Sequence, residues 1–494
     1  MFRPVLVLLA LLALPLSASA QETKAAPNGI LGLVPEDVSR EGRVTVEGAT
    51  LAYTATVGSL DLYASTGEQT AKIVYTAYSA KTAQGTERPI TFAFNGGPGA
   101  ASAYLHLGLV GPKILTFGAD GTDGTRPVLI DNPESWLAFT DLVLIDPVGT
   151  GWSRAASADV ANSFYGVRQD AESLAKAIML YTQKAGRLSA PKYLLGESYG
   201  GFRAAKVAAA LKENQGLLVS GILMVSPFIE GRFLANSDDP LSAALQLPSM
   251  AAATLERTGR FSAPALAEAE RFAMGDYLTG LATPPREREA ADALYSQVAT
   301  LTGLPPADVA RARGFVGEIY AKQAAGQGRI VSPYDAAYSV PDAYPEEPDV
   351  RNDDPMLDGY SRAYGAAFST YARDALGVRT AMTYSLLNTD VNRRWEWNGS
   401  RGGDGRALAG ASGDLRDLLS TIPAFRLMIV HGRTDVLTPY GASRYVIDHL
   451  PPDLAAGRAH LHVYPGGHMF YTDATARRAF TADAKAFYEA GTAE

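Results

Sequence analysis

The sequence predicts an α/β protein in which helices cover a mostly parallel sheet and a largely helical insertion interrupts the chain. Short apolar runs end in glycine- or proline-bearing turns, as in "DLVLIDPVGTGWS", "KYLLGESYGG" and "SGILMVSPF", with helical patterns between them. This rhythm stops near residue 236 and returns in "FRLMIVHGRTD" and "AHLHVYPGGH". Buried strands that alternate with helices are typical of a parallel sheet with crossover helices.

The chain divides into five predicted segments. Arg3, a short apolar run and "SASA" indicate a signal peptide over residues 1–20, because the apolar run is too short to span a membrane. A polar stretch with prolines and glycines predicts a flexible segment over residues 21–45. Residues 46–235 and 418–494 form the predicted core, which begins with hairpin strands. Residues 236–417 form the insertion, including a long surface loop in "SPYDAAYSVPDAYPEEPDVRNDDP".

Composition narrows the class of function. The 494 residues are 19% charged and 47% hydrophobic, which indicates a globular protein. The signal peptide predicts that the protein is exported to the periplasm or secreted, and that its mature form has no membrane span. A net charge of −8 and the lack of a Lys/Arg-rich run argue against a nucleic-acid partner. The sequence has no cysteine, which excludes thiol catalysis and disulfides. Six histidines supply the candidates for a general base.

The stretch "GESYG", residues 196–200, holds the candidate nucleophile Ser198. A plausible strand precedes it and a helical pattern follows, which is the context of a nucleophile mounted on a tight strand-to-helix turn. The alternative is a helix-capping serine between two packing glycines.

A nucleophilic serine requires a base and a group that orients the base. Asp435 and His468 each follow one of the last two predicted strands, in the order Ser, acid, His that this architecture requires. His431 ends its strand and is a weaker rival for the base. His460 and His462 alternate with apolar residues on a strand, so structure accounts for them.

The glycines of "FNGGPGA" follow another predicted strand. Such a turn can direct a backbone N–H toward a developing oxyanion, together with the N–H of the residue after the nucleophile. The amides of Gly97 and Tyr199 are therefore the predicted oxyanion hole. An ordinary glycine turn is the alternative.

The motifs "NGGPG", "DPVGTGWS", "GESYGG", "TDVLTPY" and "GGHM" resemble, in order and spacing, those of the serine carboxypeptidases of the S10 type. The likeness runs from about Ile90 to the C-terminus and suggests a cysteine-free, bacterial-like member. It implies an α/β-hydrolase fold with an insertion or cap domain. It also implies that Ser198 is acylated, that His468 is the base and that Asp435 orients it.

The resemblance further implies that Asn95, Gly96 and Glu197 hold the substrate's free C-terminal carboxylate. A second glutamate of the family falls on Leu109 here. Two carboxyls that share a proton can hold a carboxylate, whereas a single ionised Glu197 would repel it. Three explanations stay open: burial keeps Glu197 protonated, another group helps, or substrate choice has changed. His106 is a speculative helper, although a packing or surface role is favoured for it.

The sequence therefore predicts a serine carboxypeptidase that acts on peptides with a free C-terminus and needs no metal or other cofactor. The same three residues could serve an esterase, another acyl hydrolase or an acyltransferase. A non-catalytic binding protein of the cell envelope is a further, weaker alternative.

Overall fold

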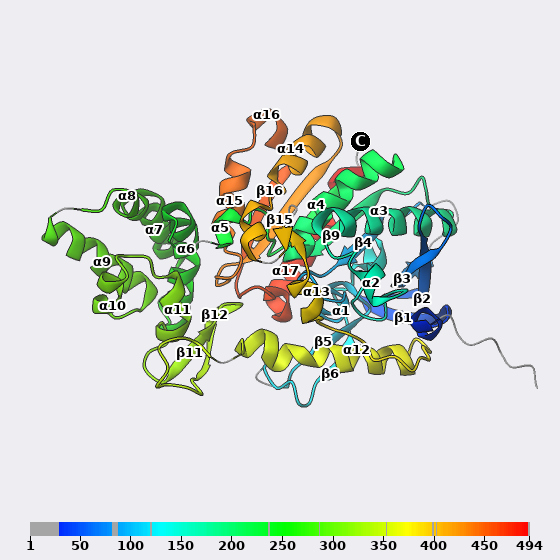
Figure 1. Ribbon diagram of the computed structural model, residues 1–494, viewed down its shortest axis with the longest axis horizontal. Coiled ribbons are helices and arrows are strands. Elements are labelled where there is room, and N and C mark those ends of the chain that lie inside the picture. Colours follow the sequence, from blue (N-terminus) through cyan, green and yellow to red (C-terminus); the bar gives the residue numbers. More distant parts are fainter. Residues whose placement is uncertain are drawn as a thin grey trace, which may run out of the picture.

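The computed structural model describes residues 29–81, 87–118, 121–235, 238–285, 287–351, 353–397, 400–401 and 403–492. The predicted signal peptide lies outside these residues. A large twisted sheet runs through the molecule (Figure 1). Its strand order is β1 (Val38–Val46), β2 (Ala49–Tyr63), β3 (Gln69–Ala80), β7 (Asp141–Ile145), β4 (Ile90–Phe94), β9 (Lys192–Glu197), β10 (Gly221–Val225), β15 (Arg426–Gly432) and β16 (Ala459–Tyr464).

The sheet is antiparallel from β1 to β7 and parallel from β7 to β16, with β8 (Arg154–Ala155) paired to β3. Every residue of β4, β7, β9 and β10 is buried, as expected for parallel strands covered on both faces. Successive side chains enter opposite cores. Leu194 of β9 packs on one face, whereas its neighbours Tyr193 and Leu195 pack on the other.

Helices cover both faces of the sheet, as the sequence predicts. One core contains side chains from α3 (Val167–Lys184), α4 (Tyr199–Ala210) and α14 (Ser412–Thr421). The opposite core contains side chains from α12 (Ala363–Asp374) and α17 (Ala474–Thr492). The short helices near the sheet are α1 (Ala103–Leu105), α2 (Ala158–Ala161), α13 (Thr389–Arg393), α15 (Tyr440–Asp448) and α16 (Pro452–Ala455). Two small hairpins complete this part of the fold. In one, β5 (Lys113–Thr116) pairs with β6 (Val128–Asp131), and in the other, β13 (Glu396–Trp397) pairs with β14 (Ser400–Arg401).

Residues 240–341, part of the chain between β10 and β15, build a helical lobe that stands apart from the sheet (Figure 1), whereas α12 and α14 of the same stretch pack against the sheet. Its elements are α6 (Pro240–Arg257), α7 (Ala263–Phe272), α8 (Leu278–Ala282), α9 (Arg288–Thr302), α10 (Pro306–Arg311), α11 (Gly317–Gln323) and the hairpin β11 (Arg329–Ser332)–β12 (Asp335–Pro341). The short helix α5 (Arg232–Ala235) precedes the lobe, and its Phe233 packs in the core of the sheet. The lobe has its own apolar core, which also includes Val436 from the loop after β15. In the described part of the chain, no helix has the length and apolar character needed to cross a membrane.

Two segments differ from the prediction. Residues 38–45, assigned to a flexible segment, form most of β1, an edge strand paired with β2. Its polar, mostly exposed residues are typical of a protected edge, and they resemble a loop in sequence. The predicted surface loop after residue 331 contains the turn of the β11–β12 hairpin. Backbone carbonyls of Pro333 and Tyr334 in this turn accept amides of the loops after β15 and β16, and these contacts fix the turn in place.

Candidate active site

Ser198 lies at the junction of β9 and α4 with φ 59° and ψ −127°, a backbone conformation that a serine rarely adopts. A methyl group on Gly196 would lie 1.9 Å from the carbonyl oxygen of Gly200, and one on Gly200 would lie 2.4 Å from that of Phe94. The tight turn therefore requires both glycines. The Ser198 side chain makes no capping hydrogen bond to α4, so the turn does not hold it as a helix cap.

Asp435 and His468 meet beyond the carboxyl ends of β15 and β16. Nδ1 of His468 lies 2.8 Å from Oδ2 of Asp435, and both side chains are buried. Burial disfavours the charged imidazole, but the charge and hydrogen bond of Asp435, together with the charges of Glu197 and Asp354, outweigh burial, so the pKa of His468 is raised. This bond fixes Nδ1 as the donor and leaves Nε2 to act as a base.

Thr438 forms hydrogen bonds with Asp435 through both its backbone amide and its hydroxyl. Asp435 Oδ1 accepts the amides of Leu437 and Thr438, each at 2.9 Å. The Thr438 hydroxyl lies 2.7 Å from Asp435 Oδ2 and 3.0 Å from His468 Nδ1, and it also contacts the carbonyl of Ser226. Asp435 is thus held on both oxygens, which orients it toward the imidazole. Thr438 was not among the predicted site residues, although its place three residues after an aspartate is typical of such a turn.

Ser198 and His468 line one cavity of about 50 Å³, room for more than one water molecule. Its lining consists of Asn95, Gly96, Gly97, Ala100, Tyr104, Glu197, Ser198, Tyr334, Leu357, Leu387, His468 and Met469. Among the hydrogen bonds of the described residues, none joins the side chains of Ser198 and His468. In sites without substrate, this contact is often long and tightens only when substrate binds.

The glycine loop after β4 lies directly on the nucleophile turn. A methyl group on Gly96 would lie 2.6 Å from the amide nitrogen of Tyr199 and 2.7 Å from the carbonyl oxygen of Glu197. Gly97, with φ 101°, lines the cavity, and Tyr199 begins α4, where helix amides have no intrahelical acceptor. The two predicted oxyanion donors therefore belong to segments in contact beside Ser198.

Glu197 is buried between Asn95 and Tyr471. The Asn95 amide donates to Oε2, and the Tyr471 hydroxyl donates to Oε1 at 2.6 Å. Burial raises the pKa of Glu197 to about 7, although the charge of His468 and the hydrogen bond from Tyr471 oppose this rise. Of the three explanations that the sequence left open, a protonated Glu197 near neutral pH is therefore physically accessible.

Leu109 and His106 both lie away from the cavity. Leu109 is fully buried in the apolar core, and its position supplies no polar group to Glu197. His106 is also buried, with Nε2 2.7 Å from the Tyr78 hydroxyl, and burial lowers its pKa to about 3. A neutral histidine engaged with Tyr78 is a packing residue, as the sequence analysis favoured.

None of the rival histidines forms a hydrogen bond with Asp435. His431 is buried with Nε2 2.7 Å from the Ser443 hydroxyl, and burial lowers its pKa to about 4. His460 and His462 are half-buried on β16. The structure therefore brings the acid to His468 alone.

The insertion also supplies part of the site. Tyr334, in the turn between β11 and β12, accepts the amide of His468 with its carbonyl, and its ring lies edge-on to the imidazole at 4.8 Å. Tyr334, Tyr104 and Tyr471 were all missed in the sequence analysis, because no local motif marks them.

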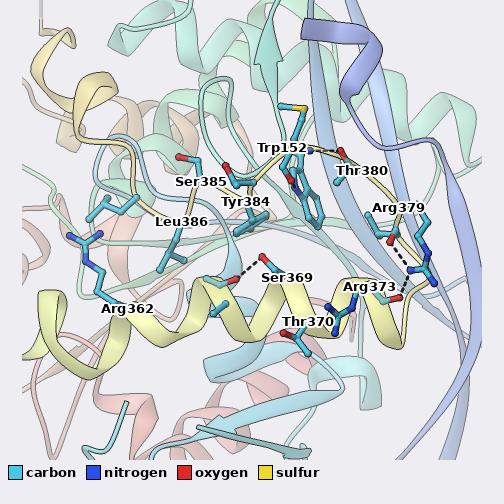
Figure 2. Close-up of a pocket in the computed structure, with 16 residues that line it drawn as sticks. Trp152, Arg362, Ser369, Thr370, Arg373, Arg379, Thr380, Tyr384, Ser385 and Leu386 are labelled. Carbon is cyan, nitrogen blue, oxygen red and sulfur yellow. Dashed lines mark hydrogen bonds between the residues drawn. The ribbon is translucent and has the colours of Figure 1, made fainter. Parts of the chain in front are cut away.

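A second, larger cavity of about 790 Å³ runs along α12. Figure 2 shows Arg362 toward one end of this helix and Arg373 and Arg379 toward the other, with Trp152 and Tyr384 across the cavity. Leu387 lines both cavities, so the larger cavity adjoins the candidate active site.

Comparisons with known proteins agree with this architecture. The serine carboxypeptidase (peptidase S10) family model matches residues 60–475. Carboxypeptidase sxa2 of Schizosaccharomyces pombe is 31% identical over 135 residues, which span 26% of this chain and 24% of that protein's length. The crystal structure of Kex1(delta)p, a prohormone-processing carboxypeptidase from Saccharomyces cerevisiae, superposes with a TM-score of 0.55 at 15% identity, over 88% of this chain and 91% of the other. That similarity confirms the predicted α/β-hydrolase fold.

Proposed function

The chain belongs to the serine carboxypeptidase family, and we propose that it releases C-terminal residues from peptides through an acyl-enzyme on Ser198. The observation that carries this proposal is the placement of Glu197. This buried carboxyl, whose pKa is raised to about 7, lines the same small cavity as Ser198 and His468. A group of this kind beside a nucleophile suits a substrate that ends in a carboxylate.

The chemistry is acyl transfer in two stages. His468 Nε2 takes the proton of Ser198 as Oγ attacks the scissile carbonyl, and the amides of Gly97 and Tyr199 stabilise the oxyanion. His468 then gives the proton to the leaving nitrogen, and the C-terminal residue departs. Water, activated by His468, hydrolyses the acyl-enzyme and restores Ser198. Asp435 holds the imidazole and stabilises its charged form.

In this proposal, the substrate's free C-terminal carboxylate is bound by Asn95, Gly96 and Glu197. All three residues line the cavity that holds Ser198. A protonated Glu197 donates a hydrogen bond to the substrate carboxylate, whereas an ionised Glu197 repels it. This contact places the last peptide bond of the substrate, and no internal bond, at the nucleophile.

The test compares hydrolysis of one N-blocked dipeptide as the free acid and as its C-terminal amide. We expect a strong preference for the free acid that grows as the pH falls toward 6. Ser198→Ala should lower kcat by several orders of magnitude in a folded protein. Equal rates for the two substrates, or near-normal turnover by Ser198→Ala, would contradict the proposal.

One observation favours a second candidate, a broader acyl hydrolase such as an esterase. Leu109 is buried in apolar surroundings and supplies no second acid to the site. If carboxylate recognition is lost, an ester of the same N-blocked residue should be hydrolysed as readily as any free-acid peptide. A fluorophosphonate reagent that labels the wild type but not Ser198→Ala would support both hydrolase candidates against a non-catalytic binding role.

Export is a further part of the proposal. Arg3, the short apolar run and "SASA" support cleavage after Ala20 and a periplasmic or secreted protein. Mass spectrometry of the protein from its native host should give a mature N-terminus at Gln21. A retained Met1 would contradict the proposal.

A further inference from the structure

We propose that two tyrosines replace the missing second acid at the carboxylate end of the site: Tyr104 donates a hydrogen bond to the substrate's free carboxylate, and Tyr471 positions Glu197 for the same contact. This inference rests on the proposed function and assigns residues that no motif of the sequence indicates. Both tyrosines come from segments next to the cavity. Tyr104 lies in α1, after the glycine loop, and Tyr471 lies three residues after His468.

Tyr104 carries a buried hydroxyl that lacks a partner. Its side chain is 4% exposed and lines the cavity together with Asn95, Glu197 and Ser198. In the part of the chain that the structure describes, its hydroxyl makes no hydrogen bond. A buried donor without an acceptor costs free energy, so its presence in a substrate cavity calls for an explanation. A carboxylate oxygen in the cavity would supply the acceptor.

A tyrosine hydroxyl suits this task over a wide pH range. Burial raises the pKa of Tyr104 above its usual value. The positive charge of Arg362 opposes this rise, and the negative charge of ionised Glu197 adds to it. The hydroxyl therefore stays protonated and uncharged wherever His468 can act as a base. Unlike a second glutamate, Tyr104 can donate to a carboxylate without the risk of like-charge repulsion.

Tyr471 acts through Glu197 and is a positioning residue. Its hydroxyl donates to Glu197 Oε1 at 2.6 Å, while Asn95 donates to Oε2. Gly108 allows this approach, because a methyl group there would lie 2.7 Å from Cε2 of Tyr471. Glu197 thus has a neutral donor on each oxygen, and neither donor competes with it for a proton as a second carboxyl would.

Tyr364 provides a matched control for Tyr104. It is also buried with a hydroxyl that has no partner within the described residues, and its ring centroid lies 5.4 Å from that of Tyr104. It does not line the cavity that holds Ser198. Loss of the Tyr364 hydroxyl therefore tests for general repacking of this cluster without removing a donor from the cavity.

The first experiment measures binding without turnover. In a Ser198→Ala background, calorimetry gives the Kd of an N-blocked amino acid and of its amide. We expect the parent to prefer the free acid. We expect Tyr104→Phe to reduce that preference about 10- to 100-fold, as for a lost hydrogen bond to a charged group. Tyr364→Phe should keep the preference within about twofold.

The outcomes separate the two proposals. Equal binding of acid and amide by the parent would overturn the proposed carboxypeptidase function and the tyrosine assignment together. A parent that prefers the free acid, with the preference unchanged in Tyr104→Phe, would overturn the tyrosine assignment alone. Equal weakening of both ligands in Tyr104→Phe would also overturn it, because a packing defect does not distinguish a carboxylate from an amide.

The second experiment tests Tyr471 through the pH profile of free-acid hydrolysis. The groups whose charges or hydrogen bonds bear on Glu197 are Asn95, Asp435, His468 and Tyr471, and Tyr104, Tyr334 and Tyr364 interact with it electrostatically. Because Tyr471 stabilises the ionised form of Glu197, Tyr471→Phe should move the loss of kcat/KM at high pH to a higher pH. A lower activity with an unmoved pH limb would overturn the positioning role.

Discussion

Tyr334 holds His468 through both its backbone and its ring. The carbonyl of Tyr334 accepts the His468 amide, and the aromatic ring lies edge-on to the imidazole at 4.8 Å and 76°. The preceding residue, Pro333, accepts the amides of Val436 and Leu437 at 3.2 and 3.1 Å. One hairpin turn of the insertion therefore fixes the loops that carry both the acid and the base, so the insertion is part of the site's framework.

This contact predicts a catalytic cost for Tyr334→Ala. Loss of the ring leaves the imidazole without packing on one side, so we expect kcat to fall about tenfold or more, since small misplacements of catalytic groups are costly. Tyr334→Phe, which keeps the ring, should retain clearly more activity than Tyr334→Ala. Equal losses in the two variants would show that the hydroxyl, and not the packing, matters.

Asp435→Asn should lower kcat by about 10,000-fold, because an amide cannot hold the imidazole in the required tautomer. Thr438→Val removes one hydroxyl contact of the same network and should cost about tenfold. Thr438→Ser keeps the hydroxyl and serves as the control. Steady-state kinetics on the N-blocked peptide measure all three, and a Thr438→Val enzyme as impaired as Asp435→Asn would contradict this ranking.

The pH dependence of kcat/KM should differ between substrates with and without a free carboxylate. Glu197, with a pKa of about 7, is protonated below neutrality and can then donate to the carboxylate. As the pH rises through 7, free-acid hydrolysis should decline, whereas hydrolysis of the matching ester should not show this limb. Because Glu197 and His468 interact, the profile reports apparent values for the pair. Identical profiles for acid and ester would exclude a role for Glu197 protonation.

The same carboxyl makes stability depend on pH. The folded pKa of Glu197 is about 7, above the 4.5 usual for this side chain. The folded protein therefore binds more protons than the unfolded chain between these values, and this group's contribution to stability decreases as the pH rises from 4.5 to 7. Glutamine does not titrate, so the difference in unfolding free energy between Glu197→Gln and wild type should change with pH. This difference should favour the variant by up to about 3 kcal/mol more at pH 8 than at pH 4.5. Urea unfolding at both pH values measures this, with Ser198→Ala as a control that should show no such difference.

Arg203 links the nucleophile helix to the glycine loop. It is 1% exposed, its Nε donates to Asp170 Oδ2 at 2.6 Å, and its Nη1 donates to the carbonyl of Asn95. Arg203→Met would leave Asp170 buried and unpaired, so we expect a loss of about 3–5 kcal/mol in unfolding free energy. Arg168→Met, which removes the exposed pair with Glu172, should cost less than about 1 kcal/mol. Comparable losses in the two variants would mean that the buried ion pair contributes no more to stability than the exposed pair.

Local sequence was sufficient for the features that depend on short-range sterics. Gly196 and Gly200 mark a turn that only glycines allow, and the order Ser198, Asp435, His468 follows from strands whose carboxyl ends share one edge of the sheet. The apolar runs predicted the parallel strands because both faces of those strands are buried. The prediction of the α/β fold needed nothing beyond these patterns.

Tertiary structure decided which distant side chains surround these residues. Tyr334 belongs to a stretch that reads as a loop, and Tyr104 and Tyr471 lie close to predicted motifs but are not part of them. Each gains its role from contacts across long separations in sequence, such as the hydrogen bond from Tyr471 to Glu197. The protonation of Glu197 is likewise a property of burial, since the same glutamate in water would be ionised at neutral pH. Composition and spacing specify which groups are present, but desolvation and donor placement arise only when the segments are packed together.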